Sequence, residues 1–237
     1  MSGRRCRAYL SLSMSKIAAF FDVDGTLVQS NVVHYYRYLA LRGASPLGKW
    51  WWYCRFLPKI PFYLVIDKID RARFNRAFYR NYAGLDARWA HSQAGALFAD
   101  FLQPRLFPGA LSALRQHLEA GHLVVLVTGS LDFLIAPLQQ YLGATDAFCV
   151  SIGERDGRFT GVLDGPPLSE EEKARVVREY AARHQLDLSA CYAYGNDPAD
   201  LPMLQAVGHP VAVNPHGALA QMAAGQGWEV RDWTLPP

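Results

Sequence analysis

Two carboxylates stand at the end of an apolar run near the start of the chain. The run covers residues 17–21 and reads as a buried strand, and Asp22 and Asp24 follow it. Carboxylates at the mouth of a buried strand are costly to desolvate unless a metal, a hydrogen-bond network or a substrate engages them. Gly25 then permits a tight turn, and Thr26 offers a hydroxyl to an anionic group. An ordinary Asp–Gly turn is the plainer interpretation, so the case for chemistry depends on the rest of the chain.

Polar residues follow two later apolar runs, residues 122–127 and 190–194, in the same way. These polar residues are Thr128, Gly129, Ser130, Asn196, Asp197 and Asp200. Between the two runs, Ser169 and Glu172 are spaced as the capping box of a helix that carries Lys173 in its first turn. In an open parallel sheet, ligands gather beyond the carboxyl ends of the strands. The pattern therefore predicts a site for phosphate and a metal ion at that edge.

In this order the segments resemble the haloacid dehalogenase superfamily, in its phosphoserine-phosphatase-like subfamily IB. The matching signatures are residues 22–26, residues 128–130, Lys173 and residues 195–200. The resemblance covers nearly the whole chain from residue 16 onward. It implies an α/β fold, with a Rossmann-like parallel sheet core and a helical C1-type cap inserted after the first strand.

The resemblance implies a phosphatase that uses Mg²⁺ and forms an aspartyl-phosphate. Asp22 would be the nucleophile, and Asp24 would protonate the leaving alkoxide and later activate water. Thr128 and Lys173 would complete the catalytic set. The implied phosphate-binding residues are Gly25, Thr26, Thr128, Gly129, Ser130 and Lys173. Two plainer interpretations stay open, a helix cap for Thr128 and a solvated surface position for Lys173.

The implied metal ligands are the carboxylate of Asp22, the backbone carbonyl of Asp24 and the first acidic residue of the last motif. That last position departs from the family pattern, because counting back four residues from Asp200 gives Asn196. Asp197 is only three residues away. The ligand is therefore either a neutral Asn196, which the spacing slightly favours, or Asp197 in a shifted loop. Asp200 would support the site.

An aromatic stretch, residues 50–66, stands out inside the expected cap. Arg55, Pro58, Lys59 and Pro61 interrupt it, so it does not supply the roughly 20 apolar residues of a membrane-spanning helix. Aromatic packing within the cap is the favoured interpretation. The alternative is an apolar lid or a peripheral contact with lipid headgroups, where Trp, Tyr and Lys are commonly found.

The resemblance implies that the substrate is a small phosphomonoester. Asn31 stands nine residues after Asp22, where phosphoserine phosphatases of the family carry a Glu for the substrate ammonium, so phosphoserine is disfavoured. The alternatives are phosphoserine itself, a lipid-precursor phosphate of the lysophosphatidate or phosphatidylglycerophosphate type, or phosphoryl transfer instead of hydrolysis. A non-catalytic binding protein is a further rival, which the retained motif residues disfavour. Candidate substrate contacts, each equally compatible with a solvated helix face, are His34, Arg37, Arg71, Arg73 and Arg76.

The elements that must position these residues follow from pattern and composition. With 237 residues, 51% hydrophobic and 19% charged, the chain is a globular protein, and its net charge of +3 does not indicate nucleic-acid binding. Cys149 and Cys191 lie in apolar runs, which favours reduced thiols and a cytoplasmic location. We expect a disordered leader at 1–15, a core of 16–30 and 106–237, and a helical cap of 31–105. Strands are expected at 17–21, 123–127, 147–151, 190–194 and 210–213, with a hairpin turn at 155–159 and an edge strand at 228–233.

Overall fold

A parallel sheet forms the centre of the computed structural model, which describes residues 17–236. Its six strands are β1 (Ala18–Phe21), β2 (Leu123–Leu131), β3 (Asp146–Val150), β6 (Tyr192–Gly195), β7 (His209–Val213) and β8 (Glu229–Arg231). Their order across the sheet is β3-β2-β1-β6-β7-β8, and each neighbouring pair is parallel. Each strand coincides with a run expected from the sequence, and the predicted α/β class is confirmed. The predicted leader lies outside the described residues.

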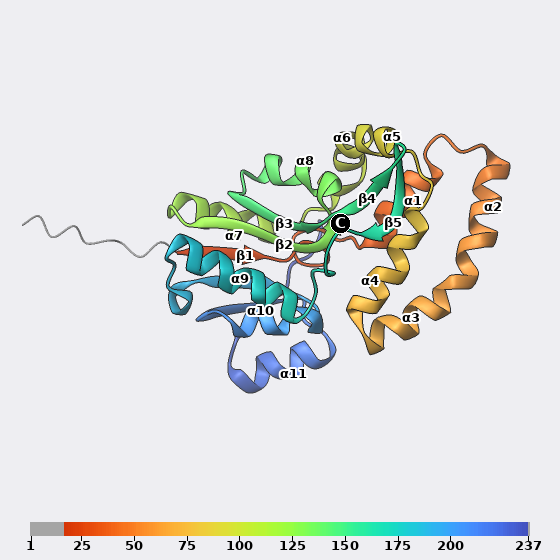
Figure 1. Ribbon diagram of the computed structural model, residues 1–237. Coiled ribbons are helices and arrows are strands. Elements are labelled where there is room, and N and C mark those ends of the chain that lie inside the picture. Colours follow the sequence, from red (N-terminus) through yellow and green to blue (C-terminus); the bar gives the residue numbers. More distant parts are fainter. Residues whose placement is uncertain (1–16, 237) are drawn as a thin grey trace, which may run out of the picture.

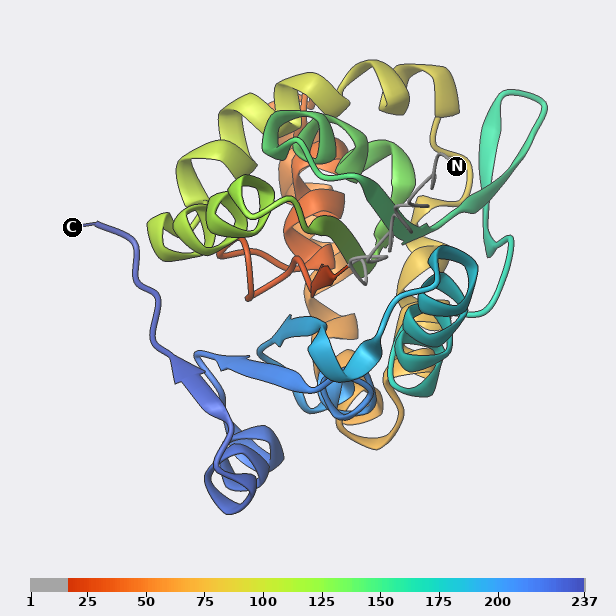
Figure 2. The ribbon, with the colours of Figure 1, turned by 90° about the vertical axis from the view of Figure 1, so that its left-hand side faces the viewer.

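Five helices cover the two faces of the sheet. They are α7 (Pro108–Glu119), α8 (Asp132–Leu142), α9 (Glu171–His184), α10 (Leu201–Gln205) and α11 (Gly217–Gln226). Helices α7 and α8 lie on one face, and α9, α10 and α11 lie on the other (Figures 1 and 2). Short helical turns η5 (Leu188–Ala190) and η6 (Pro198–Asp200) flank β6. Because parallel strands are buried on both faces, they read as continuous apolar runs in the sequence.

Strand β1 shows how the sheet is held. All four of its residues are fully buried. Successive side chains point to opposite faces, so the ring of Phe20 meets Tyr180 of α9 and that of Phe21 meets His117 of α7, at centroid distances of 5.9 and 6.0 Å. The chain leaves the sheet at Asp22, where these apolar contacts end. The strand thus delivers the first carboxylate to the carboxyl edge of the sheet.

A helical segment, residues 32–105, connects β1 to α7 and lies beyond the carboxyl ends of the strands (Figure 1). Its helices are α1 (Val32–Leu41), α2 (Pro46–Phe56), α3 (Ile60–Ile69), α4 (Arg71–Tyr79), α5 (Ala87–Ser92) and α6 (Ala94–Leu97). Short turns η1 (Leu57–Lys59), η2 (Arg80–Tyr82), η3 (Phe98–Leu102) and η4 (Gln103–Arg105) complete it. Trp52 stacks on Phe56 at 4.6 Å, and Tyr63 meets Phe78 edge-on at 5.8 Å. Aromatic packing, the favoured interpretation of the stretch, describes this inner side.

A hairpin joins the two parts of the molecule. Strands β4 (Ile152–Arg155) and β5 (Arg158–Leu163) pair antiparallel around Asp156 and Gly157, both with positive φ, as a tight two-residue turn requires. The predicted turn is confirmed. Phe159 of β5 packs against Tyr82 of the helical segment at 6.3 Å. The hairpin therefore rests on the end of α4 and η2.

The capping box predicted for Ser169 and Glu172 is wrong. Helix α9 begins at Glu171, Glu170 occupies the cap position with φ +51°, and no side chain caps the first turn. The Ser169 hydroxyl is buried without a partner among the described residues, and Glu172 pairs with Arg175. The backbone N–H of Glu170 donates to a carbonyl of η6 at 3.0 Å, a tertiary contact that shifts the helix start.

None of the helices within residues 17–236 has both the length and the apolar character needed to cross a membrane.

Candidate active site

Asp22 lies where β1 ends, on the floor of a cavity between the sheet and the helical segment. It is 5% exposed, and its backbone N–H donates to the carbonyl of Tyr194 at 2.9 Å. One carboxylate oxygen accepts from Lys173 Nζ at 2.6 Å, and the other accepts from Thr26 Oγ1 at 3.0 Å. Burial, and then the nearby carboxylate of Asp200, raises the pKa of the Asp22 carboxyl above its ordinary value, against the opposing effect of Lys173. The ionised form therefore depends on neighbouring positive charge.

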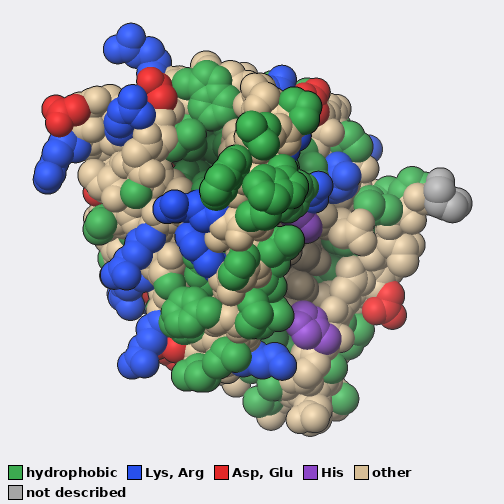
Figure 3. Space-filling view, turned by 90° about the vertical axis from the view of Figure 1, so that its right-hand side faces the viewer, with side chains coloured by type: hydrophobic (Ala, Val, Ile, Leu, Met, Phe, Trp, Pro, Cys, Tyr) green, Lys and Arg blue, Asp and Glu red, His purple; other side chains and the backbone are tan. Residues whose placement is uncertain are grey.

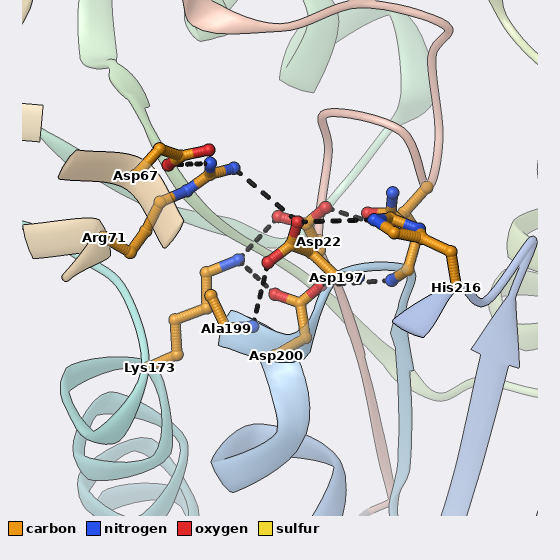
Figure 4. Close-up of polar contacts among 10 residues, drawn as sticks. Asp22, Asp67, Arg71, Lys173, Asp197, Ala199, Asp200 and His216 are labelled. Carbon is orange, nitrogen blue, oxygen red and sulfur yellow. Dashed lines mark hydrogen bonds and ion pairs between the residues drawn. The ribbon is translucent and has the colours of Figure 1, made fainter. Parts of the chain in front are cut away.

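Lys173 bridges two buried carboxylates (Figure 4). Its Nζ lies 2.6 Å from Asp22 Oδ1 and 2.7 Å from Asp200 Oδ1, and the residue is 5% exposed. Burial alone would lower the pKa of Lys173, but Asp200 and Asp22 outweigh it, so that the pKa is raised and the ammonium stays charged. The alternative of a solvated surface lysine is wrong.

Asp200 shapes the loop that follows β6. Its second oxygen accepts the backbone N–H groups of Asn196 and Asp197 at 3.0 and 3.1 Å, and the residue is 1% exposed. Asp197 and Asp200 form a reciprocal capping box at η6. Both oxygens of Asp200 are thus engaged by protein donors.

The loop places Asn196, and not Asp197, beside Asp22. The Thr26 hydroxyl lies within hydrogen-bond distance of both Asp22 Oδ2 and Asn196 Oδ1, at 3.0 and 3.1 Å. Gly25 has φ +87°, and a Cβ there would lie 2.3 Å from the Asn196 amide nitrogen, so the close approach requires glycine. Asp197 Oδ1 instead accepts from the Ala199 N–H at 2.9 Å. Gly25 and Thr26 therefore position the loop and the carboxylate and are not among the residues that line the cavity.

The second oxygen of Asp197 points toward basic side chains of two other segments (Figure 4). It lies 4.0 Å from Arg71 Nη2 of α4 and 4.0 Å from His216 Nε2. Arg71 is also paired with Asp67 of α3. Asp197 thereby links the core loop to the helical segment.

The oxygen atoms around Asp22 fit a hard cation. No group of three or more His, Cys, Asp or Glu side chains in residues 17–236 is arranged to hold a metal ion. The ligand set implied by the family resemblance is different, because it combines the Asp22 carboxylate with a backbone carbonyl and the amide oxygen of Asn196. Two of these, the oxygens of Asp22 and Asn196, converge on one hydroxyl. Such an oxygen-only set suits Mg²⁺, which keeps several waters.

Three hydroxyl groups hold the carboxylate of Asp24. Ser30 Oγ and Tyr35 OH donate to Asp24 Oδ1, at 2.7 and 2.5 Å, and Ser130 Oγ donates to Oδ2 at 2.6 Å. Tyr35 lies on α1 and is 1% exposed, so the helical segment contributes directly to the position of Asp24. The roles of Ser30 and Tyr35 were missed by the sequence reasoning, and no local pattern marks them.

The segment after the second apolar run differs in part from expectation. Strand β2 continues to Leu131, and the backbone N–H of Ser130 donates to Thr128 Oγ1 at 3.1 Å instead of facing the cavity. Thr128 is 1% exposed and lines the cavity with Gly129, whose carbonyl accepts from Tyr79 OH at 2.6 Å. No described residue accepts the proton of the Thr128 hydroxyl, which is therefore available to a ligand. Thr128 does not cap α8, which begins at Asp132 after Leu131.

The cavity has a volume of about 290 Å³, with a polar floor and an apolar wall. The floor includes Asp22, Asp24, Thr128, Lys173 and Asp200, and the wall includes Val32, Phe56, Ile60, Tyr63, Leu64 and Phe74. Of the candidate substrate contacts, His34 and Arg71 line the cavity. Arg37, Arg73 and Arg76 are exposed elsewhere.

Two asparagines at the rim of the floor have different roles. The side-chain oxygen of Asn31 caps α1, accepting from Val33 N and His34 N at 3.1 Å each. Asn75 is 4% exposed, lines the cavity and lies against Gly129. Its role was missed, because an Asn inside a helix carries no sequence signal of its own.

Comparison with known proteins gives one family and several relatives. The family model for haloacid dehalogenase-like hydrolases matches residues 19–205. The chain is 33% identical to the phosphoserine phosphatase SerB1 of Mycobacterium tuberculosis over 219 residues, which cover 92% of this chain and 71% of that protein. It is 26% identical to a histidinol-phosphatase of Neisseria meningitidis, over 91% of this chain and 98% of that one. A crystal structure of a protein of unknown function from Bordetella pertussis superposes with a TM-score of 0.76 at 26% identity, covering 92% and 99% of the two chains.

Proposed function

The chain belongs to the haloacid dehalogenase-like hydrolase family, and from this premise we propose that it is a phosphatase that cleaves a small phosphomonoester with the help of Mg²⁺. The observation that carries the proposal is the placement of Asp22. A buried carboxylate lies 2.6 Å from a buried ammonium on the floor of a cavity, beside the free hydroxyl proton of Thr128. Lys173 and Thr128 can offset the charge of a bound phosphate, which is the main requirement of phosphoryl transfer.

The proposed reaction has two steps. Asp22 attacks phosphorus, the bond to the leaving oxygen breaks, and Asp24 gives a proton to that alkoxide. Asp24 then takes a proton from water, the resulting hydroxide attacks phosphorus, and the bond to Asp22 breaks to release inorganic phosphate. The hydroxyl donors of Ser30, Tyr35 and Ser130 hold Asp24 in place during both transfers. Mg²⁺, held by Asp22, the Asp24 carbonyl and Asn196, would supply charge that reduces the repulsion between phosphate and Asp22.

The helical segment acts as a cap in this proposal. It supplies the apolar wall of the cavity and two of its cationic or titratable side chains, Arg71 and His34. Such a division leaves bond cleavage to the core and substrate choice to the helices.

The apolar wall of the cavity favours a second class of substrate. Phe56, Ile60 and Phe74 present an apolar surface to whatever is attached to the phosphate. Asn31 is neutral, and its side-chain oxygen is already used by the helix, so no carboxylate stands there to pair with an ammonium. A phosphomonoester with an apolar group, such as lysophosphatidate, suits this cavity better than phosphoserine.

The test is phosphate release from a panel that contains phosphoserine, histidinol phosphate and a short-chain lysophosphatidate, with Mg²⁺ and with a chelator. We expect Asp22→Asn to reduce the rate about 10³-fold or more, because the nucleophile is lost. Asp187→Asn is the matched control, since Asp187 is an exposed cap residue outside the cavity and Asn can cap equally. Phosphate release that survives Asp22→Asn would overturn the proposal.

The covalent step has its own test. Hydroxylamine added during turnover should convert an acyl phosphate at Asp22 into a hydroxamate, which peptide mass spectrometry can locate. A hydroxamate on another residue, or none under conditions of full activity, would contradict the assignment of Asp22 as nucleophile.

A further inference from the structure

The solvent-exposed surface of α2, η1 and α3, which reaches the rim of the cavity at Leu64, carries an unusual number of large apolar side chains (Figure 3). Eight of the eleven exposed large hydrophobic residues in the described part of the chain lie between residues 47 and 69. We call this the α2–α3 face, and it consists of Leu47, Trp50, Trp51, Leu57, Phe62, Leu64, Val65 and Ile69. Each is between 52% and 72% exposed. Contiguous patches of this kind mark interaction sites on proteins.

The same helices already satisfy their packing on the other side. Trp52 stacks on Phe56, Phe56 meets Tyr36 at 5.7 Å, and Tyr63 packs against Phe74 and Phe78. On the outer side, Trp50 and Trp51 contact each other edge-on at 5.7 Å and remain 58% and 63% exposed. The apolar residues of the α2–α3 face are therefore surplus to the fold of the segment.

The charge of the face indicates what it can contact. Residues 46–69 contain four cations, Lys49, Arg55, Lys59 and Lys68, and one carboxylate, Asp67. Asp67 is paired with Arg71, whereas none of the four cations forms an ion pair with another described residue. Lys59 Nζ donates to Asn81 Oδ1 at 2.8 Å, so Lys49, Arg55 and Lys68 are the cations left to an outside partner. A contact with a second copy of this face would bring both sets of cations together without a free carboxylate. Charge complementarity thus favours an anionic partner with an apolar layer beneath it.

We propose that the α2–α3 face docks on the surface of an anionic lipid bilayer. Trp50, Trp51 and Phe62 enter the headgroup region, where indole and phenyl rings are favoured. The exposed side chains of Lys49, Arg55 and Lys68 contact lipid phosphates. Polar contact and apolar insertion act together, as in interfacial amphipathic helices.

Docking would bring the cavity close to the lipid. Leu64 belongs to the α2–α3 face and also lines the cavity, whose wall is built from the inner side of the same helices through Phe56 and Ile60. A phosphomonoester with an acyl chain could then pass from the bilayer to the floor without crossing much water. This consequence rests on the proposed function, whereas the docking itself does not.

The experiment is flotation of the full chain with two kinds of vesicle, phosphatidylcholine alone and phosphatidylcholine with phosphatidylglycerol in equal parts. We expect the protein to float with the anionic vesicles and to stay behind with the neutral ones. Trp50→Ser combined with Trp51→Ser should reduce the bound fraction about tenfold, and Lys49→Gln with Arg55→Gln should weaken binding and its dependence on salt.

Matched controls use exposed apolar residues elsewhere. Tyr141→Ser on α8 and Val162→Ser on β5 remove side chains that are 50% and 64% exposed, and they should leave flotation unchanged. Absence of flotation with anionic vesicles would overturn the proposal, and so would equal losses in the tryptophan and control variants. Self-association in sedimentation velocity that the tryptophan variant abolishes, without vesicle binding, would assign the face to a second copy instead. Since binding is read without substrate, a failed phosphatase assay does not affect this result.

Discussion

The floor of the cavity and the α2–α3 face differ in which side chains they bury: the floor buries charged groups, whereas the face exposes apolar ones. On the floor, Asp22, Lys173 and Asp200 are at most 5% exposed, and each is bonded to another of the three. On the α2–α3 face, apolar rings such as Trp51 are exposed, and nearby cations such as Lys49 have no acidic partner among the described residues. Buried charges hold one another in a single geometry, which bond cleavage requires. Exposed rings and unpaired cations suit a surface that must adapt to its partner.

The largest expected effect tests the buried network. Asp200→Ala would leave Lys173 with one partner and the N–H groups of Asn196 and Asp197 without an acceptor. We expect the free energy of unfolding to fall by about 3 kcal/mol, because two loop N–H groups lose their acceptor and Lys173 loses one of its two charged hydrogen bonds. Urea denaturation of the two proteins measures the difference.

The matched change in the helical segment should cost far less. Asp67 and Arg71 are about one-third exposed, and their pair is shielded by solvent. Asp67→Ala should therefore lower the free energy of unfolding by less than about 1 kcal/mol. If both variants lose the same stability, the distinction between the two regions fails.

The second prediction concerns the loop after β6. Because Asn196 lies beside Asp22 and Asp197 points to Arg71, Asn196→Ala should raise the Mg²⁺ concentration for half-maximal activity about tenfold or more. Asp197→Ala should change it by less than about threefold, and Asn196→Asp should lower it by adding a charged ligand. A titration of activity with Mg²⁺ decides between them. Equal shifts in the two alanine variants would contradict the assignment of Asn196, and not Asp197, as the Mg²⁺ ligand.

A smaller effect tests whether the helical segment takes part in the chemistry of the core. Tyr35→Phe removes one of three hydroxyl donors to Asp24. We expect kcat to fall about fivefold, the equivalent of roughly 1 kcal/mol, while KM stays unchanged, since Tyr35 positions Asp24 without lining the cavity. Steady-state kinetics separates the two constants.

Tyr38→Phe is the control for that change. Tyr38 lies one turn further along α1, and its hydroxyl donates to the exposed carboxylate of Asp100 at 2.8 Å. Loss of this surface bond should leave kcat unaffected. A comparable loss in both variants would mean that the helix, and not the bond to Asp24, controls the rate.

Local pattern was enough to predict the core but not the contacts between parts. The central strands β1, β2, β6 and β7 follow from apolar runs that are largely buried, and the turn at Asp156 follows from residues that accept positive φ. The convergence of Asp22 and Lys173 followed from family resemblance together with the geometry of parallel sheets.

What was missed depends on tertiary contacts. The hydroxyls of Ser30 and Tyr35 reach Asp24 only because α1 packs over the loop after β1. Helix α9 starts later than its capping pattern indicates, because Glu170 is bonded to the carbonyl of Ala199. Neither contact leaves a spacing that a single sequence reveals.

The last prediction returns to the core and concerns His117, whose ring packs against Phe21. It is 7% exposed, its ring nitrogens lie 2.8 Å from His122 Nδ1 and 2.9 Å from Tyr194 OH, and burial, then His122, lowers the pKa of His117 to about 4. When the pH falls below 6.5, the ordinary pKa of histidine, His117 binds a proton in the unfolded chain but not in the folded chain. Stability is therefore complete above that pH and is lost as the pH falls toward 4.

Between pH 7 and roughly pH 5.5 this loss should be about 1 kcal/mol, measured as the change in the free energy of unfolding in urea. His117→Gln keeps a partner for the Tyr194 hydroxyl but does not titrate, so the stability of this variant should depend less steeply on pH over that range.

In the helical segment, burial also lowers the pKa of His34, whose Nδ1 has no partner among the described residues. Because His34 is only half-buried, His34→Gln should flatten the profile less than His117→Gln. The reverse order would show that acid sensitivity resides in the helical segment and not in the core.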